Sequence, residues 1–374
     1  MNEPVNDPPV ISRIDGAIGR LILNRPKAIN ALDHEMVGIF GERLHAWAHD
    51  DTVAAVLVSG AGDRGLCAGG DIVAIHRDAA AIALGASPTD SSAQSSLSAG
   101  FWRDEYRLNA LIAEYPKPYV VLMDGIVMGG GVGISAHGNT RVVTERTRLA
   151  MPETGIGFVP DVGGTHLLAR IPDELGTYLA LTAGSVTGSD AIAVGLADHY
   201  VPSDRLDTLA ERIVAVGVDA ALTEMADEPP VSELWAQREW IAAAFAGDSV
   251  PEIVGRCRDL ATPESTRAAD AISRKSPTAL AVTLRSLRTA ATEASLHDAL
   301  VREYRVSLRC LQSPDLAEGI RAQVIDKDRN PAWQPAGLDD VGDSDVEPYF
   351  AALPDDLTFT TNEINETNEE ALHA

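Results

Sequence analysis

The sequence contains few of the features that mark secreted, membrane-spanning or metal-binding proteins. Its three cysteines, Cys67, Cys257 and Cys310, are too few and too scattered in 374 residues for a disulfide framework or a zinc cluster. No run of about 18 apolar residues occurs, and the N-terminus lacks both a basic and an apolar region. We therefore predict neither a membrane span nor a signal peptide, and we expect a cytoplasmic protein in a reducing compartment.

Basic residues are also scarce. Lysine and arginine number 30 against 55 acidic residues, which gives a formal net charge of -25 and a pI near 4.6. Such a chain is repelled by nucleic acids and by anionic membranes, so we predict neither as a partner. A small anionic ligand stays compatible if it meets a local basic patch. The histidines and acids form no metal-ligand pattern such as HExxH, so no metal is predicted.

Strand-like and helical patterns alternate over the first 200 residues. The continuous apolar runs are typical of buried strands, and two of them lead through glycine clusters into helices. Repeated strand, strand, helix units imply an α/β spiral of small sheets backed by helices, although periodicity alone also allows a doubly wound sheet. The expected strands lie at 18–23, as part of a hairpin, and at 53–62, 117–125 and, as a pair, 140–153.

The pattern becomes helical after Ile171 and stays mostly amphipathic and helical to Asp328. Earlier, residues 85–100 are small, polar and rich in serine, which predicts a mobile loop. The residues after NPAWQP are acidic and interrupted by proline and glycine. We therefore predict three parts: a core at 1–200 that holds the functional site, a helical C-terminal region at 201–335, and a flexible acidic tail at 336–374.

Two carboxylates stand among apolar residues and glycines in the stretch LAMPETGIGFVPDVGGTHLLAR, which spans 149–170. They are Glu153 and Asp161. Apolar neighbours predict a partly desolvated cleft, in which the pKa values of two acids can be pushed apart. A structural explanation remains open for each: Asp161 as the cap of the helix that follows it, and Glu153 as a rim carboxylate paired with an arginine.

Glycines stand at two strand-to-helix junctions, as Gly69-Gly70 and as Gly129-Gly130-Gly131. A helix start leaves N–H groups without intrahelical partners, and glycine lets a ligand approach that backbone closely. We predict that the N–H groups of Gly70 and Gly130 converge as an oxyanion hole, in which each donor contributes roughly 3–4 kcal/mol. Alternatively, both clusters are tight turns that only allow close packing.

At this point the chain resembles a known family, the crotonase (enoyl-CoA hydratase/isomerase) superfamily. The resemblance covers residues 10–200 and rests on the motifs NRPKAINAL, LCAGGDI, MGGGVGIS and MPETGIG. Within the superfamily, the chain is most similar to the 3-hydroxyisobutyryl-CoA hydrolase branch, and this narrower resemblance reaches to about residue 335. The motifs of that branch are FWRDEYRLN, MPETGIGFVPDVGG, GTYLALTAG and AEGIRAQVIDKDRNPAWQP.

The resemblance implies a crotonase-like spiral and the hydrolysis of a short hydroxyacyl-CoA thioester in valine breakdown. It implies Gly70 and Gly130 as oxyanion donors and Glu153 and Asp161 as the acid-base pair. As substrate contacts it implies Glu105, with Ala68 and Asp71 beside the first glycine pair. Coenzyme A is part of the substrate, and no further cofactor is expected.

One departure separates the chain from hydratases. Those proteins carry a second glutamate three residues after the middle glycine of GGG, and here that position is Gly133. A hydratase or isomerase with altered acid-base residues remains the alternative, and a non-catalytic acyl-CoA-binding protein is a second one. His137, on the same predicted helix as Gly133, is predicted to be a packed core residue rather than a catalyst.

The nucleotide end of coenzyme A needs positive charge. Arg25 and Lys27 are the predicted contacts, with Lys275 as a further candidate, although each is also compatible with a solvated surface charge. Arg77 is predicted to lie on the surface. The resemblance also allows a homo-oligomer, since superfamily members commonly form trimers through their C-terminal helices.

Overall fold

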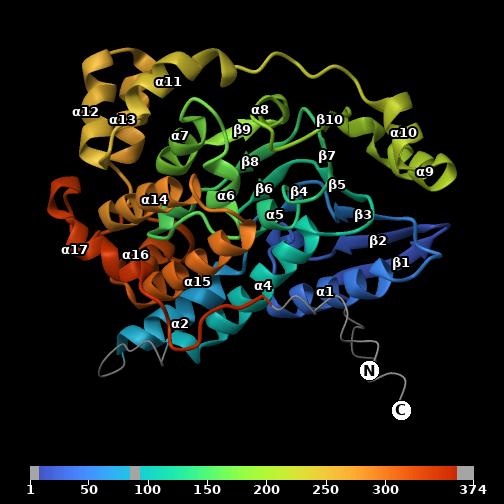
Figure 1. The fold of residues 1–374 in the computed structure, drawn as a ribbon, viewed down its shortest axis with the longest axis horizontal. Helices are drawn as coiled ribbons and strands as arrows, with labels where there is room; N and C mark the ends of the chain where they lie inside the picture. Colours follow the sequence, from blue (N-terminus) through green and yellow to red (C-terminus); the bar gives the residue numbers. More distant parts are fainter. Residues whose placement is uncertain (1–7, 85–92, 360–374) are drawn as a thin grey trace.

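The computed structural model describes residues 8–84 and 93–359, which form an α/β spiral of two sheets covered by helices (Figure 1). The larger sheet has the strand order β1-β2-β3-β5-β7-β10, and the smaller one has the order β4-β6-β8-β9. The strands are β1 Val10–Asp15, β2 Ile18–Leu23, β3 Ala55–Gly60, β4 Gly65–Cys67, β5 Tyr119–Met123, β6 Ile126–Met128, β7 Thr140–Val143, β8 Arg148–Ala150, β9 Ser185–Thr187 and β10 His199–Tyr200.

Each repeat contributes one strand to each sheet. The first strands of the three repeats, β3, β5 and β7, are parallel neighbours in the larger sheet. The second strands, β4, β6 and β8, are parallel neighbours in the smaller sheet. The strands β1 and β2 form the predicted antiparallel hairpin. The predicted spiral is therefore confirmed, and the doubly wound sheet is excluded.

Helices fill the spaces between the repeats and are the main elements of the C-terminal half of the described chain. In the spiral they are α1 His34–Ala48, α2 Ile72–Leu84, α4 Leu97–Ala113, α5 Gly130–Gly133, α6 Gly164–Leu168, α7 Leu175–Thr182 and α8 Gly188–Ala193. Beyond it they are α9 Leu206–Val216, α10 Val218–Met225, α11 Arg238–Phe245, α12 Val250–Leu260, α13 Pro263–Ile272, α14 Pro277–Ala290, α15 Leu296–Gln312, α16 Pro314–Ile320 and α17 Asp343–Val346.

The larger sheet is buried on both faces, which explains why its strands have continuous apolar sequences. In β3, Val56 and Val58 point into the main core, whereas Ala55 and Leu57 point to the opposite face. The helices α9 and α10 cover that opposite face, and an extended segment connects them to α11 across the molecule (Figure 1). One apolar cluster continues from the spiral into α11–α16. The division of the chain into a core at 1–200 and a helical region at 201–335 stays a prediction.

Two sequence predictions about local structure differ from the structure. The region after Ile171 is not purely helical, because β9 and β10 add one short strand to each sheet. Three-residue and two-residue strands are too short for an alternating pattern to show in the sequence. The predicted serine-rich loop lies partly outside the described residues, at 85–92, and its last residues belong to α4, which begins at Leu97 with Ser96 as its N-cap.

The predicted flexible tail is corrected over its described part, residues 336–359. Val346, Leu353 and Leu357 are buried in the main core. Two aspartates of the same segment pair with arginines of the helices below, at 2.7 Å for Asp355–Arg103 and 2.5 Å for Asp356–Arg305. The acids that suggested a flexible tail therefore form ion pairs that hold the segment against α4 and α15. Residues 360–374 lie outside the described residues.

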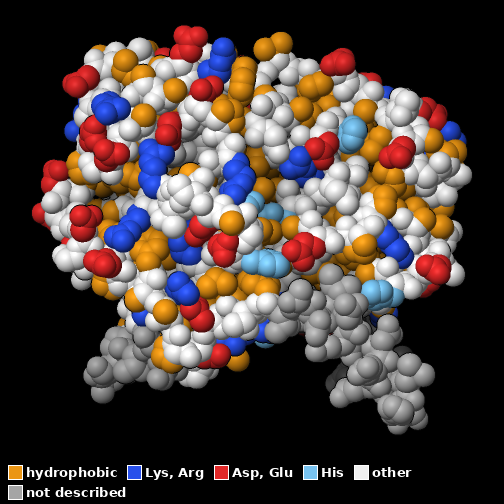
Figure 2. All heavy atoms as spheres, viewed as in Figure 1, with side chains coloured by type: hydrophobic (Ala, Val, Ile, Leu, Met, Phe, Trp, Pro, Cys, Tyr) orange, Lys and Arg blue, Asp and Glu red, His pale blue; other side chains and the backbone are white. Residues whose placement is uncertain are grey.

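Acidic and basic side chains are interspersed on the face shown in Figure 2. Several of them form ion pairs between elements, such as Arg141–Asp198 at 2.6 Å and Arg288–Glu174 at 2.7 Å. Among the described residues, no helix combines the length and the apolar character that crossing a membrane requires.

Candidate active site

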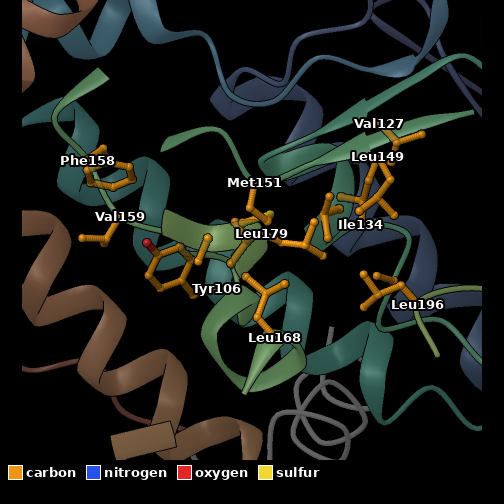
Figure 3. Packing of buried hydrophobic residues seen from close by; sticks show 14 of the residues in the cluster. Tyr106, Val127, Ile134, Leu149, Met151, Phe158, Val159, Leu168, Leu179 and Leu196 are labelled. Carbon is orange, nitrogen blue, oxygen red and sulfur yellow. The ribbon is translucent and has the colours of Figure 1, made fainter. Parts of the chain in front are cut away.

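The glycine junctions and the buried carboxylates meet in one pocket of about 320 Å³. Its apolar walls include Trp102 and Phe158, whose rings stack with centroids 5.4 Å apart. In the main core, Met151 and Leu179 lie between Tyr106 on one side and Ile134 and Leu149 on the other (Figure 3). The predicted site residues that line the pocket are Ala68, Gly70, Glu105, Gly130, Glu153 and Asp161.

The two glycine junctions lie against each other. A β-carbon built on Gly130 would lie 3.5 Å from the Gly70 nitrogen, and one built on Gly69 would lie 3.7 Å from the Gly130 nitrogen. Gly130 is the first residue of α5, so its N–H has no partner within that helix. The N–H groups of Gly70 and Gly130 are therefore close enough to face one ligand atom, and their oxyanion role stays a prediction.

Glu153 begins the short 3-10 helix Glu153–Ile156, directly after β8 and Pro152. It is not a rim residue paired with an arginine: the side chain is 6% exposed, and its Oε2 atom has no partner among the described residues. Its Oε1 atom lies 3.1 Å from the position of a β-carbon on Gly129. Burial, and then the negative charge of Asp161, raise the pKa of Glu153 well above its usual range.

Asp161 is not the cap of the following helix, because the N-cap of α6 is Gly163, which has no side chain to accept a hydrogen bond from the helix. Asp161 instead precedes a tight turn in which Val162 and Gly163 have positive φ values of 55° and 77°. A β-branched residue rarely adopts this conformation, so the surrounding structure must hold it. Burial, followed by the negative charge of Glu303, raises the pKa of Asp161 to about 8.

His137 supports this turn, as a packed residue rather than a catalyst. Its Nε2 lies 2.8 Å from the carbonyl oxygen of Val162, so Nε2 carries the proton and donates it. Burial lowers the pKa of His137 to about 4, which keeps the ring neutral.

The sequence analysis missed the residues that hold Asp161 in place. The Tyr106 hydroxyl donates to Asp161 Oδ2 at 2.9 Å and lies 2.8 Å from the Ser307 hydroxyl. The Glu303 carboxylate accepts from the Gly163 N–H at 2.6 Å and from the Thr165 N–H at 3.0 Å. Tyr106 is adjacent to Glu105 in the RDEY motif, which was the only available signal. Ser307 and Glu303 lie more than 140 positions from Asp161 on an amphipathic helix, where sequence spacing carries no information about them.

Glu105 and Gly133 are related through the packing of α4 on α5. Glu105 is 2% exposed, and its Oε1 lies 2.5 Å from the position of a β-carbon on Gly130. One turn further along α4, Asn109 Nδ2 lies 2.8 Å from the position of a β-carbon on Gly133, and Val162 Cβ lies 2.7 Å from it. The place at which hydratases carry their second glutamate therefore has no room for a side chain.

Three predicted contacts, Arg25, Lys27 and Asp71, do not line the pocket. Arg25 is paired with Asp71 at 3.2 Å and with Asp33 at 3.3 Å, and Lys27 is exposed. Their roles as substrate contacts stay predictions. Lys275 does line the pocket, and burial, followed by the charge of Arg274, lowers the pKa of its ammonium group. Arg77 is exposed, as predicted.

The spiral and the pocket at its two glycine junctions define an enzyme of the crotonase fold. Comparison with known proteins agrees with this class. The model of the family described as enoyl-CoA hydratase/isomerase matches residues 18–350, and the chain belongs to that family.

Curated relatives resemble the chain over most of its length. The mitochondrial 3-hydroxyisobutyryl-CoA hydrolase of Gallus gallus is 38% identical over 355 residues, which are 92% of this chain and 89% of the relative. The protein of the same name from Homo sapiens is 36% identical over 356 residues, with the same two coverages of 92% and 89%.

Two solved structures share both the fold and much of the sequence. A carnitinyl-CoA dehydratase from Mycobacterium thermoresistibile is 53% identical, with a TM-score of 0.89 over 95% of this chain and 100% of that chain. An enoyl-CoA hydratase from Rhodobacter sphaeroides 2.4.1 is 38% identical, with a TM-score of 0.86 over 94% of this chain and 100% of that chain.

Proposed function

We propose that this protein hydrolyses the thioester of a short hydroxyacyl-CoA, with 3-hydroxyisobutyryl-CoA as the preferred substrate. The products are 3-hydroxyisobutyrate and coenzyme A, which places the reaction in valine breakdown. The names of the curated relatives support this substrate.

The observation that carries the proposal is the closed position of Gly133. A two-glutamate addition of water to an enoyl-CoA needs a carboxylate there, and Val162 and Asn109 occupy that space. Glu105 on α4 also lines the pocket, whereas the carboxylates Glu153 and Asp161 both lie on the segment that follows β8. Hydrolysis requires one group that activates water or attacks the carbonyl and one that handles the proton of the leaving thiolate, and this pair is sufficient for both tasks.

In the proposed reaction, the N–H groups of Gly70 and Gly130 bind the thioester oxygen and stabilise its negative charge after attack. Glu153 either takes a proton from water, whose oxygen then bonds to the carbonyl carbon, or attacks that carbon itself to give a mixed anhydride that water hydrolyses. The C–S bond breaks with its electron pair on sulfur. Asp161, which holds a proton up to about pH 8, donates it to the thiolate or contacts the substrate hydroxyl.

Single turnover in ¹⁸O-labelled water tests the nucleophilic role of Glu153. If water opens a mixed anhydride at the Glu153 carboxyl carbon, the label enters Glu153 and the first acyl product is unlabelled. Label in the first acyl product means that water bonded to the acyl carbon, either in direct attack on the thioester or in hydrolysis of the anhydride at that carbon.

For the coenzyme A part of the substrate, we propose Lys275 at the pocket wall as a contact with its anionic groups. Arg25 and Lys27 are further candidates outside the pocket. The reaction, as proposed, uses no cofactor or metal, because the bond changes require only proton transfer and charge stabilisation.

The alternative is a hydratase or isomerase, and the names of the two solved relatives favour it. A non-catalytic acyl-CoA binder is the second alternative, although burying two carboxylates in a pocket is costly without a chemical use for them. Product identity separates the three: hydrolysis releases free thiol, hydration removes the enoyl double bond, and a binder only raises the melting temperature with ligand.

The test is thiol release from 3-hydroxyisobutyryl-CoA by the wild-type protein and by Glu153→Ala and Asp161→Asn, with an enzyme-only blank for the three cysteines. The proposal predicts turnover by the wild type and at least a 10²-fold loss in both variants while coenzyme A still binds. Wild-type activity that survives in Glu153→Ala would refute the two-carboxylate mechanism.

We further propose a cytoplasmic location, which the three buried free cysteines support because a reducing compartment keeps thiols free. The curated relatives are described as mitochondrial, so targeting of this chain is to be settled by localising the tagged protein. A homo-oligomer is proposed from the family resemblance, and its test is the mass measured by sedimentation.

A further inference from the structure

Glu105 is a pocket carboxylate with little support for a negative charge. Its side chain is buried, and Oε1 has no hydrogen-bond partner among the described residues. Asp161 receives a hydrogen bond from the Tyr106 hydroxyl, whereas Glu153 also has one carboxylate oxygen without a partner among the described residues. A buried carboxylate without a donor is expensive, so a proton shared between Glu105 and Asp161 resides on Glu105 first.

The charged and titratable groups around Glu105 reinforce this order. Burial, and then the negative charge of Asp161, raise the pKa of Glu105 well above its usual range. Two other titratable groups near Glu105 are the Cys67 thiol on β4 and the Tyr106 hydroxyl on α4. Each would be negative if ionised, so neither stabilises a negative charge on Glu105. Glu153 and Lys275 line the same pocket, and Lys275 is the basic residue among the lining residues. Its ammonium lies beside Gly155, 3.3 Å from the position of a β-carbon there.

Glu105 also lies where a negative charge would oppose the reaction. Its Oε1 is 2.5 Å from the point at which a Gly130 β-carbon would stand, and the Gly70 nitrogen is 3.5 Å from the same point. An ionised Glu105 beside these N–H groups would repel the charge that develops on the thioester oxygen. A protonated carboxyl group in the same place would donate a hydrogen bond to the bound acyl group.

We infer that Glu105 works as a neutral carboxylic acid that donates a hydrogen bond to an oxygen of the bound acyl group, beside the Gly70 and Gly130 N–H groups. The inference rests on the proposed hydrolase function for its kinetic test only. In this role Glu105 is a third donor at the thioester, whereas Glu153 alone supplies the basic or nucleophilic oxygen.

Two substitutions at position 105 separate a donor from a base. Glu105→Gln keeps the shape and offers an amide N–H donor, so kcat/KM stays within about tenfold of the wild-type value. Glu105→Leu keeps an apolar bulk without a donor, and kcat/KM falls by about 10²-fold or more. Glu153→Gln is the matched control: the same chemical change at the base removes activity. Equal losses in Glu105→Gln and Glu105→Leu, or no loss in either, would overturn the inference.

A second measurement does not depend on turnover. The infrared difference spectrum between wild type and Glu105→Gln at neutral pH is predicted to contain the carbonyl stretch of a protonated carboxyl group. A difference confined to carboxylate bands would overturn the inference whatever the kinetics show. If the wild type releases no thiol, the proposed function fails, and the spectrum still decides the protonation state of Glu105.

Discussion

At the scale of single residues, the pocket gathers acids that would all prefer water. Glu105, Glu153, Asp161 and Glu303 are buried, and the pKa values of all four are raised, with burial as the largest cause. Partial support comes from Tyr106 at Asp161 and from the N–H groups of the turn at Glu303. Burying these acids lowers the free energy of unfolding, and in exchange the site holds Asp161 protonated near neutral pH.

Asp161→Asn is expected to stabilise the protein increasingly as the pH rises from about 4 to about 8. In that window the unfolded wild-type chain releases the proton of Asp161 while the folded protein keeps it up to a pKa of about 8. As a result, the free energy of unfolding of the wild type falls by up to about 1.4 kcal/mol per pH unit relative to the Asn variant. The stabilisation from protonated Asp161 is fully present only below about pH 4. Urea unfolding at about pH 5 and about pH 7.5 measures the difference.

Asp190→Asn is the control for this experiment. The Asp190 carboxylate accepts hydrogen bonds from Thr187 and Ser232, and its pKa is lowered. Its replacement should destabilise the protein at both pH values. A carboxylate whose pKa is lowered by folding stabilises the protein at any pH above its pKa in the unfolded chain, and this stabilisation is lost only in acid. A gain for Asp161→Asn that does not grow with pH would contradict the account of the acid cluster.

Gly130→Ala tests the crowding at the predicted oxyanion hole. The new methyl group would lie 2.5 Å from Glu105 Oε1 and 3.1 Å from Leu32 Cδ1. Alanine keeps the backbone N–H, but its methyl group displaces Glu105 and the bound thioester oxygen, so we expect kcat/KM to fall by about 10²-fold. Gly38→Ala is the control, because a β-carbon on this exposed residue of α1 meets no atom within 4 Å. Full activity in Gly130→Ala would remove Gly130 from the proposed mechanism.

At the scale of elements, the sequence predicted most of the larger sheet, the glycine junctions and the helices, but not which helix residues complete the site. Continuous apolar runs identify β3 and β5 because both faces of the larger sheet are buried. Glu153 and Asp161 were found because acids among apolar residues are unusual. Tyr106 and Glu303 could not be found, because α4 and α15 approach the turn after Asp161 only through tertiary packing, which periodicity does not encode.

The contact between α4, α5 and this turn predicts the effect of a side chain at position 133. In Gly133→Ala the methyl group would lie 2.7 Å from Val162 Cβ and 2.8 Å from Asn109 Nδ2. Val162 is already held at a φ of 55°, so it has little freedom to move away. We expect a loss of about 1–3 kcal/mol in the free energy of unfolding.

The control for this change is Gly255→Ala on α12, where a β-carbon meets no atom within 4 Å. Urea denaturation of both variants checks the prediction. If Gly133→Ala were as stable as the wild type, position 133 would have room for a side chain, and the main support for hydrolysis over hydration would be lost.

At the scale of the whole molecule, composition was misleading about the C-terminal segment. Acidic residues with proline and glycine resemble a flexible tail, yet residues 336–359 complete the main core. Their aspartates meet Arg103 on α4 and Arg305 on α15, so this segment packs against the two helices that support the pocket. The composition of the segment shows that it is acidic, but it does not show that arginines of other helices lie next to its aspartates.

Leu357→Ala tests this docking. Leu357 is 2% exposed, and its truncation is expected to lower the free energy of unfolding by about 2–5 kcal/mol. Thr358→Ala, at the exposed neighbouring position, should leave stability within about 0.5 kcal/mol of the wild type. Thermal and urea unfolding of the two variants provide the comparison. Equal stability of both would mean that the segment does not dock in solution.

The most direct test of the central claim compares two reactions in one preparation of the wild-type protein. Thiol release is followed with 3-hydroxyisobutyryl-CoA, and loss of the double bond is followed with an enoyl-CoA of the same chain length. We predict steady thiol release and no hydration above the uncatalysed rate. Hydration of the enoyl-CoA without thiol release would contradict the hydrolase proposal and would replace it with the hydratase alternative.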